Sequence, residues 1–156
     1  MSVINLKLNK FDLSAIDTSC KIVIIGKPGT GKSTLIKDIL YNFRNRLPVG
    51  VAMVGTLEGV EDYRTFMPDT YIYDEYNQEV IDNMLKRQNK AVKRVWRNPY
   101  AFLAMDDCMY DKKWLKERST RDIFMNGRHY KLLVIIALQY SMDIPPSLRT
   151  CLDYIF

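Results

Sequence analysis

The chain has 156 residues, 47% of them hydrophobic, which suits one domain with a substantial core and excludes a disordered tail. Its longest apolar runs have only the length of strands, which excludes a membrane span or secretory signal, so an intracellular protein is expected. The formal net charge of +5 permits contact with a polyanion, and the three cysteines lack the spacing of a zinc site or a disulfide framework.

The first half of the chain begins with a segment of unclear pattern. Residues 1–19 have no sustained period, and we expect a lead-in segment or an edge strand there, followed by one α/β domain over residues 20–156. An apolar run at residues 22–25 predicts the first buried strand.

The most informative motif follows that strand directly. Residues 26–33 read G-x-x-x-x-G-K-S, and a helical pattern comes next. In this context the glycines let backbone N–H groups converge on phosphates, and the helix points its positive end at the same anions. Lys32 is expected on the β- and γ-phosphates and Ser33 on Mg²⁺. The residues expected to bind ATP are Gly26, Lys27, Pro28, Gly29, Thr30, Gly31, Lys32, Ser33 and Thr34.

Three further elements are predicted before residue 74. Apolar residues recur at helical spacing from Leu35 to Phe43, and Pro48 prevents the helix from continuing. The apolar run 49–54 predicts a buried strand, the polar stretch 55–69 a loop, and residues 70–73 a weaker short strand.

A long amphipathic helix is predicted from Gln78 to Trp96, with Asn77 as its N-cap. Its apolar stripe is formed by Ile81, Met84, Leu85, Val92, Val95 and Trp96. The opposite face is basic, with Lys86, Lys90, Lys93 and Arg97 close to one line and Arg87 and Arg94 beside it. Two interpretations stay open for this basic stripe: a solvated helix face, or a surface that contacts phosphates.

An acidic pair follows the next predicted strand, residues 100–105. Because ligands collect at the carboxyl ends of parallel strands, Asp106 and Asp107 are expected beside the phosphate loop. We expect Asp106 to hold the Mg²⁺ shell and Asp107 to orient or deprotonate the attacking water. A second acid at this place favours hydrolysis over phosphoryl transfer to a metabolite.

In the last third of the chain, the residue pattern predicts a helix followed by a strongly apolar strand. Residues 119–122 have the form of a capping box, and Gly127 is expected to end the helix. Arg128 is a candidate arginine finger that acts on a neighbouring subunit, in competition with Arg118, Arg121 and Arg149. The apolar run 132–138 predicts a strand covered on both faces, and Gln139 at its end is a candidate sensor of the γ-phosphate or the lytic water.

Together these elements predict an α/β P-loop NTPase core, in which a mainly parallel sheet is covered by helices on both faces.

Five segments also occur in the order found in the genome-packaging ATPases of large nucleocytoplasmic DNA viruses, which the chain resembles over residues 20–156. That family is typified by the poxvirus packaging ATPase and belongs to the FtsK-HerA group of DNA pumps. The segments are the phosphate loop, residues 103–108 with the acidic pair, residues 124–129 with Gly-Arg-His, the strand ending at Gln139, and residues 144–149.

The resemblance implies a RecA-like (ASCE) core that binds ATP and Mg²⁺, forms a homo-oligomeric ring around double-stranded DNA and moves a genome into a capsid. It implies nucleotide-site positions for Lys32, Ser33, Asp106 and Gln139, and a trans-acting role for Arg128. Asp107 matches the acidic pair of the viral branch of this group but departs from the Asp-Glu pair of the wider group. Capsid or packaging-vertex components are implied as partners, and the host-cell cytoplasm (the viral factory) and the virion as locations. Family members run further, so the chain is expected to be a core fragment or a shortened member of the family.

Two other functions are compatible with the same motifs. One is a P-loop kinase for a small molecule, and the other is a nucleotide-dependent assembly protein without efficient hydrolysis. Long duplex DNA is expected to stimulate a DNA pump, whereas phosphate transfer to a small acceptor indicates a kinase. Oligomerisation without turnover indicates an assembly protein.

Overall fold

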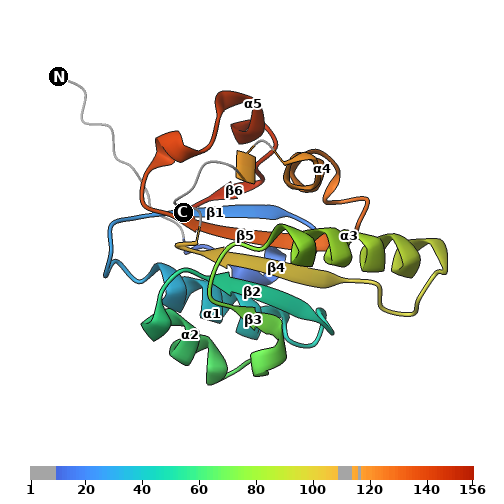
Figure 1. Ribbon diagram of the computed structural model, residues 1–156, viewed down its shortest axis with the longest axis horizontal. Helices are drawn as coiled ribbons and strands as arrows, with labels where there is room; N and C mark the ends of the chain where they lie inside the picture. Colours follow the sequence, from blue (N-terminus) through green and yellow to red (C-terminus); the bar gives the residue numbers. More distant parts are fainter. Residues whose placement is uncertain (1–9, 109–113, 116) are drawn as a thin grey trace.

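Six parallel strands form one sheet in the order β3-β2-β4-β5-β1-β6 in the computed structural model, which describes residues 10–108, 114–115 and 117–156 (Figure 1). The strands are β1 Lys21–Ile25, β2 Gly50–Val54, β3 Ile72–Tyr73, β4 Ala101–Asp106, β5 Leu132–Leu138 and β6 Tyr154–Ile155. The helices are α1 Lys32–Phe43, α2 Leu57–Arg64, α3 Gln78–Lys93, α4 Arg118–Asn126 and α5 Pro146–Arg149. The predicted α/β fold with a parallel sheet is confirmed.

Helices cover both faces of the sheet, and each face has its own buried core (Figure 1). On one face α1 and α2 contribute fully buried side chains such as Ile36, Phe43 and Tyr63. On the other face α3, α4 and α5 pack against the sheet through residues such as Ile81 and Phe124. Every residue of β5 is buried, which explains why its sequence is apolar without alternation.

The strand order brings three distant parts of the sequence together. β5 lies between β1 and β4, with Ile25 opposite Leu138 and Asp106 opposite Ala137. The strands are parallel, so the segments that follow them meet at one side of the sheet, here called the carboxyl edge. The phosphate loop, the acidic pair and Gln139 all lie there, and the opposite side is the amino edge.

Residues 55–69 do not form the predicted loop, because they contain α2. Its N-cap is Thr56, whose hydroxyl accepts a hydrogen bond from the Gly59 N–H at 3.1 Å. Val60 and Tyr63 turn toward the sheet and are buried. The helix is short and contains a glycine, so its local propensity is weak and burial of these two side chains stabilises it.

α3 ends at Lys93 and not at the predicted Trp96. The Asn77 cap is confirmed, since its side chain accepts a hydrogen bond from the Val80 N–H at 3.2 Å. However, Val92, Val95 and Trp96 are exposed by 37, 85 and 41%, so the end of the predicted apolar stripe is wrong. Val95 adopts φ 50°, a left-handed conformation that ends the helix where the chain turns back into β4.

The predicted capping box of α4 is also wrong. The helix begins at Arg118 after the N-cap Glu117, so Ser119 lies inside it. The Ser119 hydroxyl donates instead to Asp82 of α3, which ties the two helices together. Gly127 follows the last helical residue, as predicted.

The segment before β1 contains no strand within described residues 10–19, where a 3₁₀ turn, η1 Leu13–Ala15, is found; residues 1–9 lie outside the described part. The short strand predicted near residues 70–73 is confirmed as β3. The cysteines Cys20, Cys108 and Cys151 are free thiols. Within the described part of the chain, no helix has the length and apolarity needed to cross a membrane.

Candidate nucleotide-binding site

The phosphate loop owes its shape to its glycines. Gly29 and Gly31 have φ values of 76° and 88°, a conformation that residues with a side chain rarely adopt. A Cβ on Gly26 would lie 2.4 Å from the Thr30 hydroxyl, which itself donates to the Lys27 carbonyl at 2.8 Å. α1 begins at Lys32, so the loop leads directly into a helix N-terminus. This combination favours the binding of an anion.

Lys32 joins the phosphate loop to the acidic pair. Its side chain is only 6% exposed, although it carries a positive charge. The ammonium group lies 3.2 Å from Oδ2 of Asp107 and 3.4 Å from the Lys27 carbonyl oxygen. A buried charge requires such partners, and phosphate oxygens can serve the same purpose.

Asp106 lies at the end of β4 and is 3% exposed. Its Oδ2 accepts a hydrogen bond from the Tyr63 hydroxyl at 3.3 Å. Burial raises the pKa of Asp106 and the charge of Asp107 adds to this, whereas the Ser33 and Tyr63 hydroxyls and Lys32 oppose it. The remaining oxygen, Oδ1, is buried without a hydrogen-bond partner among the described residues.

A magnesium ion fits this arrangement. The unpartnered Oδ1 of Asp106 is a hard oxygen ligand of the kind that Mg²⁺ takes, and the Ser33 hydroxyl lies close enough to affect this carboxyl. The described residues contain no cluster of three or more His, Cys, Asp or Glu side chains suited to a metal. Ser33 and Asp106 would therefore hold the ion only together with phosphate oxygens and water, as is usual for Mg²⁺.

Asp107 is held in an unusual backbone conformation. Its φ is 49°, and its carbonyl oxygen lies so close to Gly55 that a Cβ on Gly55 would be 2.2 Å away. The Gly55 N–H donates to the Asp106 carbonyl at 2.9 Å, which joins the end of β2 to the acidic pair. The Asp107 side chain is 26% exposed, so it can contact water as well as Lys32.

Gln139 follows β5 at the same edge, between the phosphate loop and the acidic pair. The Gly26 N–H donates to the Leu138 carbonyl at 3.1 Å, which fixes the loop beside this strand end. The Gln139 side chain is exposed and makes no hydrogen bond with any described residue. Its position is compatible with the sensor role predicted for it.

Arg128 lies at the amino edge, in the turn before β5, on the side of the sheet opposite the phosphate loop. Its guanidinium pairs with Asp153, and its side chain is 63% exposed. The Asp153 carboxylate also accepts a hydrogen bond from the Lys21 N–H at 2.8 Å. Arg128 therefore lies away from the nucleotide site of its own subunit and pairs with Asp153 instead.

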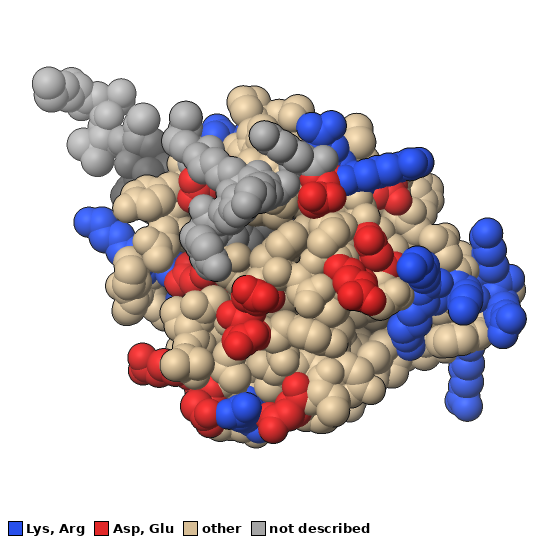
Figure 2. Space-filling view, in the orientation of Figure 1, with Lys and Arg blue, Asp and Glu red and all other residues tan. Residues whose placement is uncertain are grey.

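The basic stripe also extends toward the amino edge, because α3 ends where the chain turns into β4. Figure 2 shows Lys and Arg side chains gathered over this end of α3. Lys86, Lys90, Lys93 and Arg97 are all exposed, and none forms an ion pair with another described residue. The arrangement leaves both interpretations of the stripe open.

Two residues of the site were missed by the sequence analysis. Tyr63 reaches Asp106 from α2, and Gly55 makes room for the Asp107 backbone. Thr56 in a capping position, with Val60 and Tyr63 three residues apart, was an available but weak helical signal. Nothing in the sequence connects either residue with the acidic pair.

Comparison with known protein sequences gives a consistent result. A family model described as Poxvirus A32 protein matches residues 8–156. The uncharacterised protein 075L of Invertebrate iridescent virus 6 is 46% identical over 136 residues, covering 87% of this chain and 53% of that protein. Protein 015R of Frog virus 3 is 40% identical over 146 residues, covering 91% of this chain and 45% of that protein. The chain thus spans about half the length of these curated relatives.

Solved structures share the fold. The genome packaging NTPase B204 from Sulfolobus turreted icosahedral virus 2, in complex with ATP-gammaS, matches with a TM-score of 0.64 and 18% identity over 90% of this chain and 75% of that chain. ATPases 2 and 3 of EssC from Geobacillus thermodenitrificans match with a TM-score of 0.58 and 15% identity over 88% of this chain and 32% of that chain. The chain thus has the fold of P-loop ATPases. Together with the sequence matches, this confirms the resemblance drawn from the motifs: the chain belongs to the Poxvirus A32 protein family.

Proposed function

We propose that this chain is the ATP-hydrolysing core of a motor that moves double-stranded viral DNA into a capsid. One observation carries the proposal: a buried lysine of the phosphate loop, a buried carboxylate with a free oxygen and a second carboxylate all meet at the carboxyl edge. Membership of the Poxvirus A32 family and the shared fold of a viral packaging NTPase add support.

In this proposal each residue has a distinct task. Lys32 holds the β- and γ-phosphates, while Ser33 and Asp106 would hold Mg²⁺, which when bound would supply positive charge beside the phosphates. Asp107 orients the attacking water and takes its proton, since it is the carboxylate with access to solvent. Gln139 contacts the γ-phosphate or that water and so distinguishes the bound nucleotide.

The partners follow from the positions of the basic groups. Arg128 at the amino edge serves the site of the next subunit in a ring, because its own site lies at the other edge. The basic stripe contacts DNA phosphates, a contact that does not depend on base sequence. Capsid or packaging-vertex components complete the machine in the host cytoplasm and the virion.

The test is steady-state ATP hydrolysis with and without linear duplex DNA, on this chain and on a longer version that includes the region present in the relatives. We expect duplex DNA to stimulate hydrolysis, and the Lys32→Ala variant to remain inactive in both conditions. Transfer of phosphate to a nucleoside or another small acceptor would point to a kinase instead. Nucleotide-driven assembly without ATP turnover would indicate that the chain is an assembly protein.

A further inference from the structure

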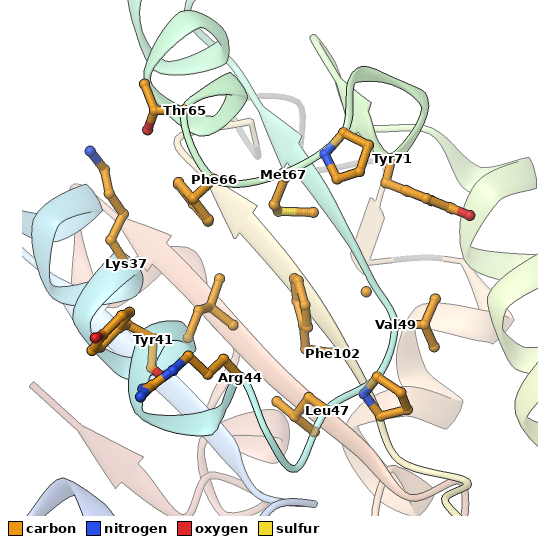
Figure 3. Close-up of a pocket in the computed structure, with 14 residues that line it drawn as sticks. Lys37, Tyr41, Arg44, Leu47, Val49, Thr65, Phe66, Met67, Tyr71 and Phe102 are labelled. Carbon is orange, nitrogen blue, oxygen red and sulfur yellow. The ribbon is translucent and has the colours of Figure 1, made fainter.

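A pocket lies on the α1 face of the sheet, between the C-terminal half of α1 and residues 65–71 (Figure 3). Its volume is about 560 Å³, and none of the candidate nucleotide-site residues lines it. Phe102 lies across its centre, directly over Gly50, where a Cβ would be only 2.1 Å from the ring. The walls are apolar and include Leu40, Leu47 and Met67.

The rim of this pocket is aromatic and carries an available positive charge. Tyr41, Phe66 and Tyr71 are exposed by 63, 41 and 44%. The Arg44 guanidinium lies 3.9 Å from the Tyr41 ring centroid, and no described acidic residue pairs with it. Among the residues that the structure describes, no acidic side chain lines the pocket, and its other cation, Lys37, is already paired with Asp62. Aromatic residues and arginine around an apolar pocket are typical of protein-binding surfaces.

The same face of the molecule presents a complementary feature at the carboxyl edge. Leu57, the first residue of α2, is 81% exposed, more than most large apolar side chains of a folded domain. Glu58 follows it, is also exposed and forms no ion pair with a described residue, whereas Glu61 is paired with Arg64. An exposed apolar side chain thus lies beside an unpaired carboxylate.

These two features lie at opposite ends of β2. The pocket surrounds Gly50, the first residue of the strand, and Leu57 comes three residues after its last residue, Val54. A strand of this length spans roughly 17 Å, so one copy does not place its own Leu57 in its own pocket. Two copies in head-to-tail order can place Leu57 of one copy in the pocket of the other. Repeated head-to-tail contacts of this kind build rings.

We propose that the first turn of α2 docks into the pocket of a second copy, with Leu57 against the apolar walls and the Glu58 carboxylate on Arg44. The pocket is larger than one leucine side chain, so the whole turn is the inserting element. Val95 is also highly exposed, but Arg94 and Arg97 lie nearby in the sequence, and Arg44 would repel them. The proposal rests on the proposed function for its role in a ring, and it names the surfaces that join the subunits.

The contact would also lie beside the site of hydrolysis. Leu57 follows Thr56 and Gly55, and Gly55 touches the Asp107 backbone. When a neighbour's pocket holds the first turn of α2, Leu57 lies in that pocket. Leu57 is only two residues along the chain from Gly55, which contacts the acidic pair. This arrangement connects subunit contact with the position of Asp107.

Sedimentation of the protein with Mg²⁺ and ATP-gammaS tests the contact. We expect the parent to self-associate, and Leu57→Asp, Glu58→Arg and Arg44→Glu each to weaken association by about tenfold or more. The double variant Arg44→Glu/Glu58→Arg is the decisive test. It restores the charge pair with reversed signs at every contact, so association should recover. Glu79→Arg, in the first turn of α3, is the matched control and should change nothing.

The outcomes separate this contact from the proposed function. A parent protein that stays monomeric at every concentration overturns the proposal, as do single variants that associate normally or a double variant that does not recover. If the monomeric parent instead binds a synthetic acidic peptide with an apolar anchor through Arg44, the pocket serves another protein. If the chain assembles through this contact but does not hydrolyse ATP, the proposed motor function is contradicted and the proposed interface is supported.

Discussion

At the scale of single residues, Lys32 is the group on which nucleotide binding depends most. It is a buried cation whose ammonium group lies between Asp107 and the Lys27 carbonyl oxygen of the phosphate loop. We predict that Lys32→Ala lowers ATP hydrolysis by about 100-fold or more, since a preorganised charge in a site contributes on that order. Phosphate release measures the effect, and circular dichroism checks that the fold is retained. Hydrolysis at the parent rate by a folded variant would refute the assignment.

The two residues of the acidic pair should have different roles, with Asp106 binding the metal and Asp107 activating the water. We predict that Asp107→Asn still binds Mg-ATP but hydrolyses it at least about tenfold more slowly, because a general base contributes ~100- to 10,000-fold. Asp106→Asn should in addition raise the Mg²⁺ concentration needed for half-maximal activity, because it removes the oxygen that has no other partner. A magnesium titration of both variants decides the point. The reverse pattern would mean that the two roles are exchanged.

Gly55 offers a steric test of the Asp107 position. Gly55→Ala places a Cβ 2.2 Å from the Asp107 carbonyl oxygen, so the backbone of the acid must move. We predict a loss of about 1–3 kcal/mol in the free energy of unfolding, the usual cost of overpacking, together with slower hydrolysis. Gly59→Ala is the matched control, since its Cβ crowds only the Val54 and Thr56 side chains. The control should lower the melting temperature and spare hydrolysis; equal losses of activity in both would count against a specific role for Gly55.

At the scale of secondary-structure elements, the basic stripe of α3 is the surface that distinguishes a DNA pump from other ATPases. If it follows DNA phosphates, replacing Lys86, Lys90, Lys93 and Arg97 by glutamine should weaken binding equally across duplex sequences. The dependence of affinity on salt should flatten by about one unit of slope for each phosphate that is no longer neutralised. Fluorescence anisotropy over a salt series measures both effects, with Lys10→Gln as a control outside the stripe. If the slope of DNA affinity against salt concentration does not change, the basic stripe is a solvated helix face that does not contact DNA.

At the scale of the whole molecule, the location of Arg128 makes cooperation between subunits testable. Its guanidinium lies at the amino edge, away from the nucleotide site of its own subunit. We predict that Arg128→Ala subunits bind ATP normally but hydrolyse it poorly when assembled. In mixed rings, Arg128 of a Lys32→Ala subunit can face an intact phosphate loop on an Arg128→Ala neighbour, and partial activity should return. Rings shown to be mixed that recover no activity would transfer the role to Arg149 or Arg121.

Much of the fold could be predicted from the sequence because it depends on neighbours along the chain. The phosphate loop requires glycines within six residues of one another, and buried parallel strands require continuous apolar runs such as 132–138. The Asn77 cap and the stop at Gly127 are equally local. The sequence by itself therefore determined the α/β class, the family and the candidate residues of the nucleotide site.

The tertiary structure decided what depends on contacts between distant residues. α2 is stabilised by burial of Tyr63, whose hydroxyl reaches Asp106 across 43 positions, and Ser119 bonds Asp82 across 37 positions instead of capping its own helix. Strand order placed Gln139 between the phosphate loop and the acidic pair, and the parallel direction of the strands placed Arg128, which precedes β5, at the opposite edge. Such outcomes follow from the packing of helices on the sheet and from the order of its strands, which no local pattern of residues records.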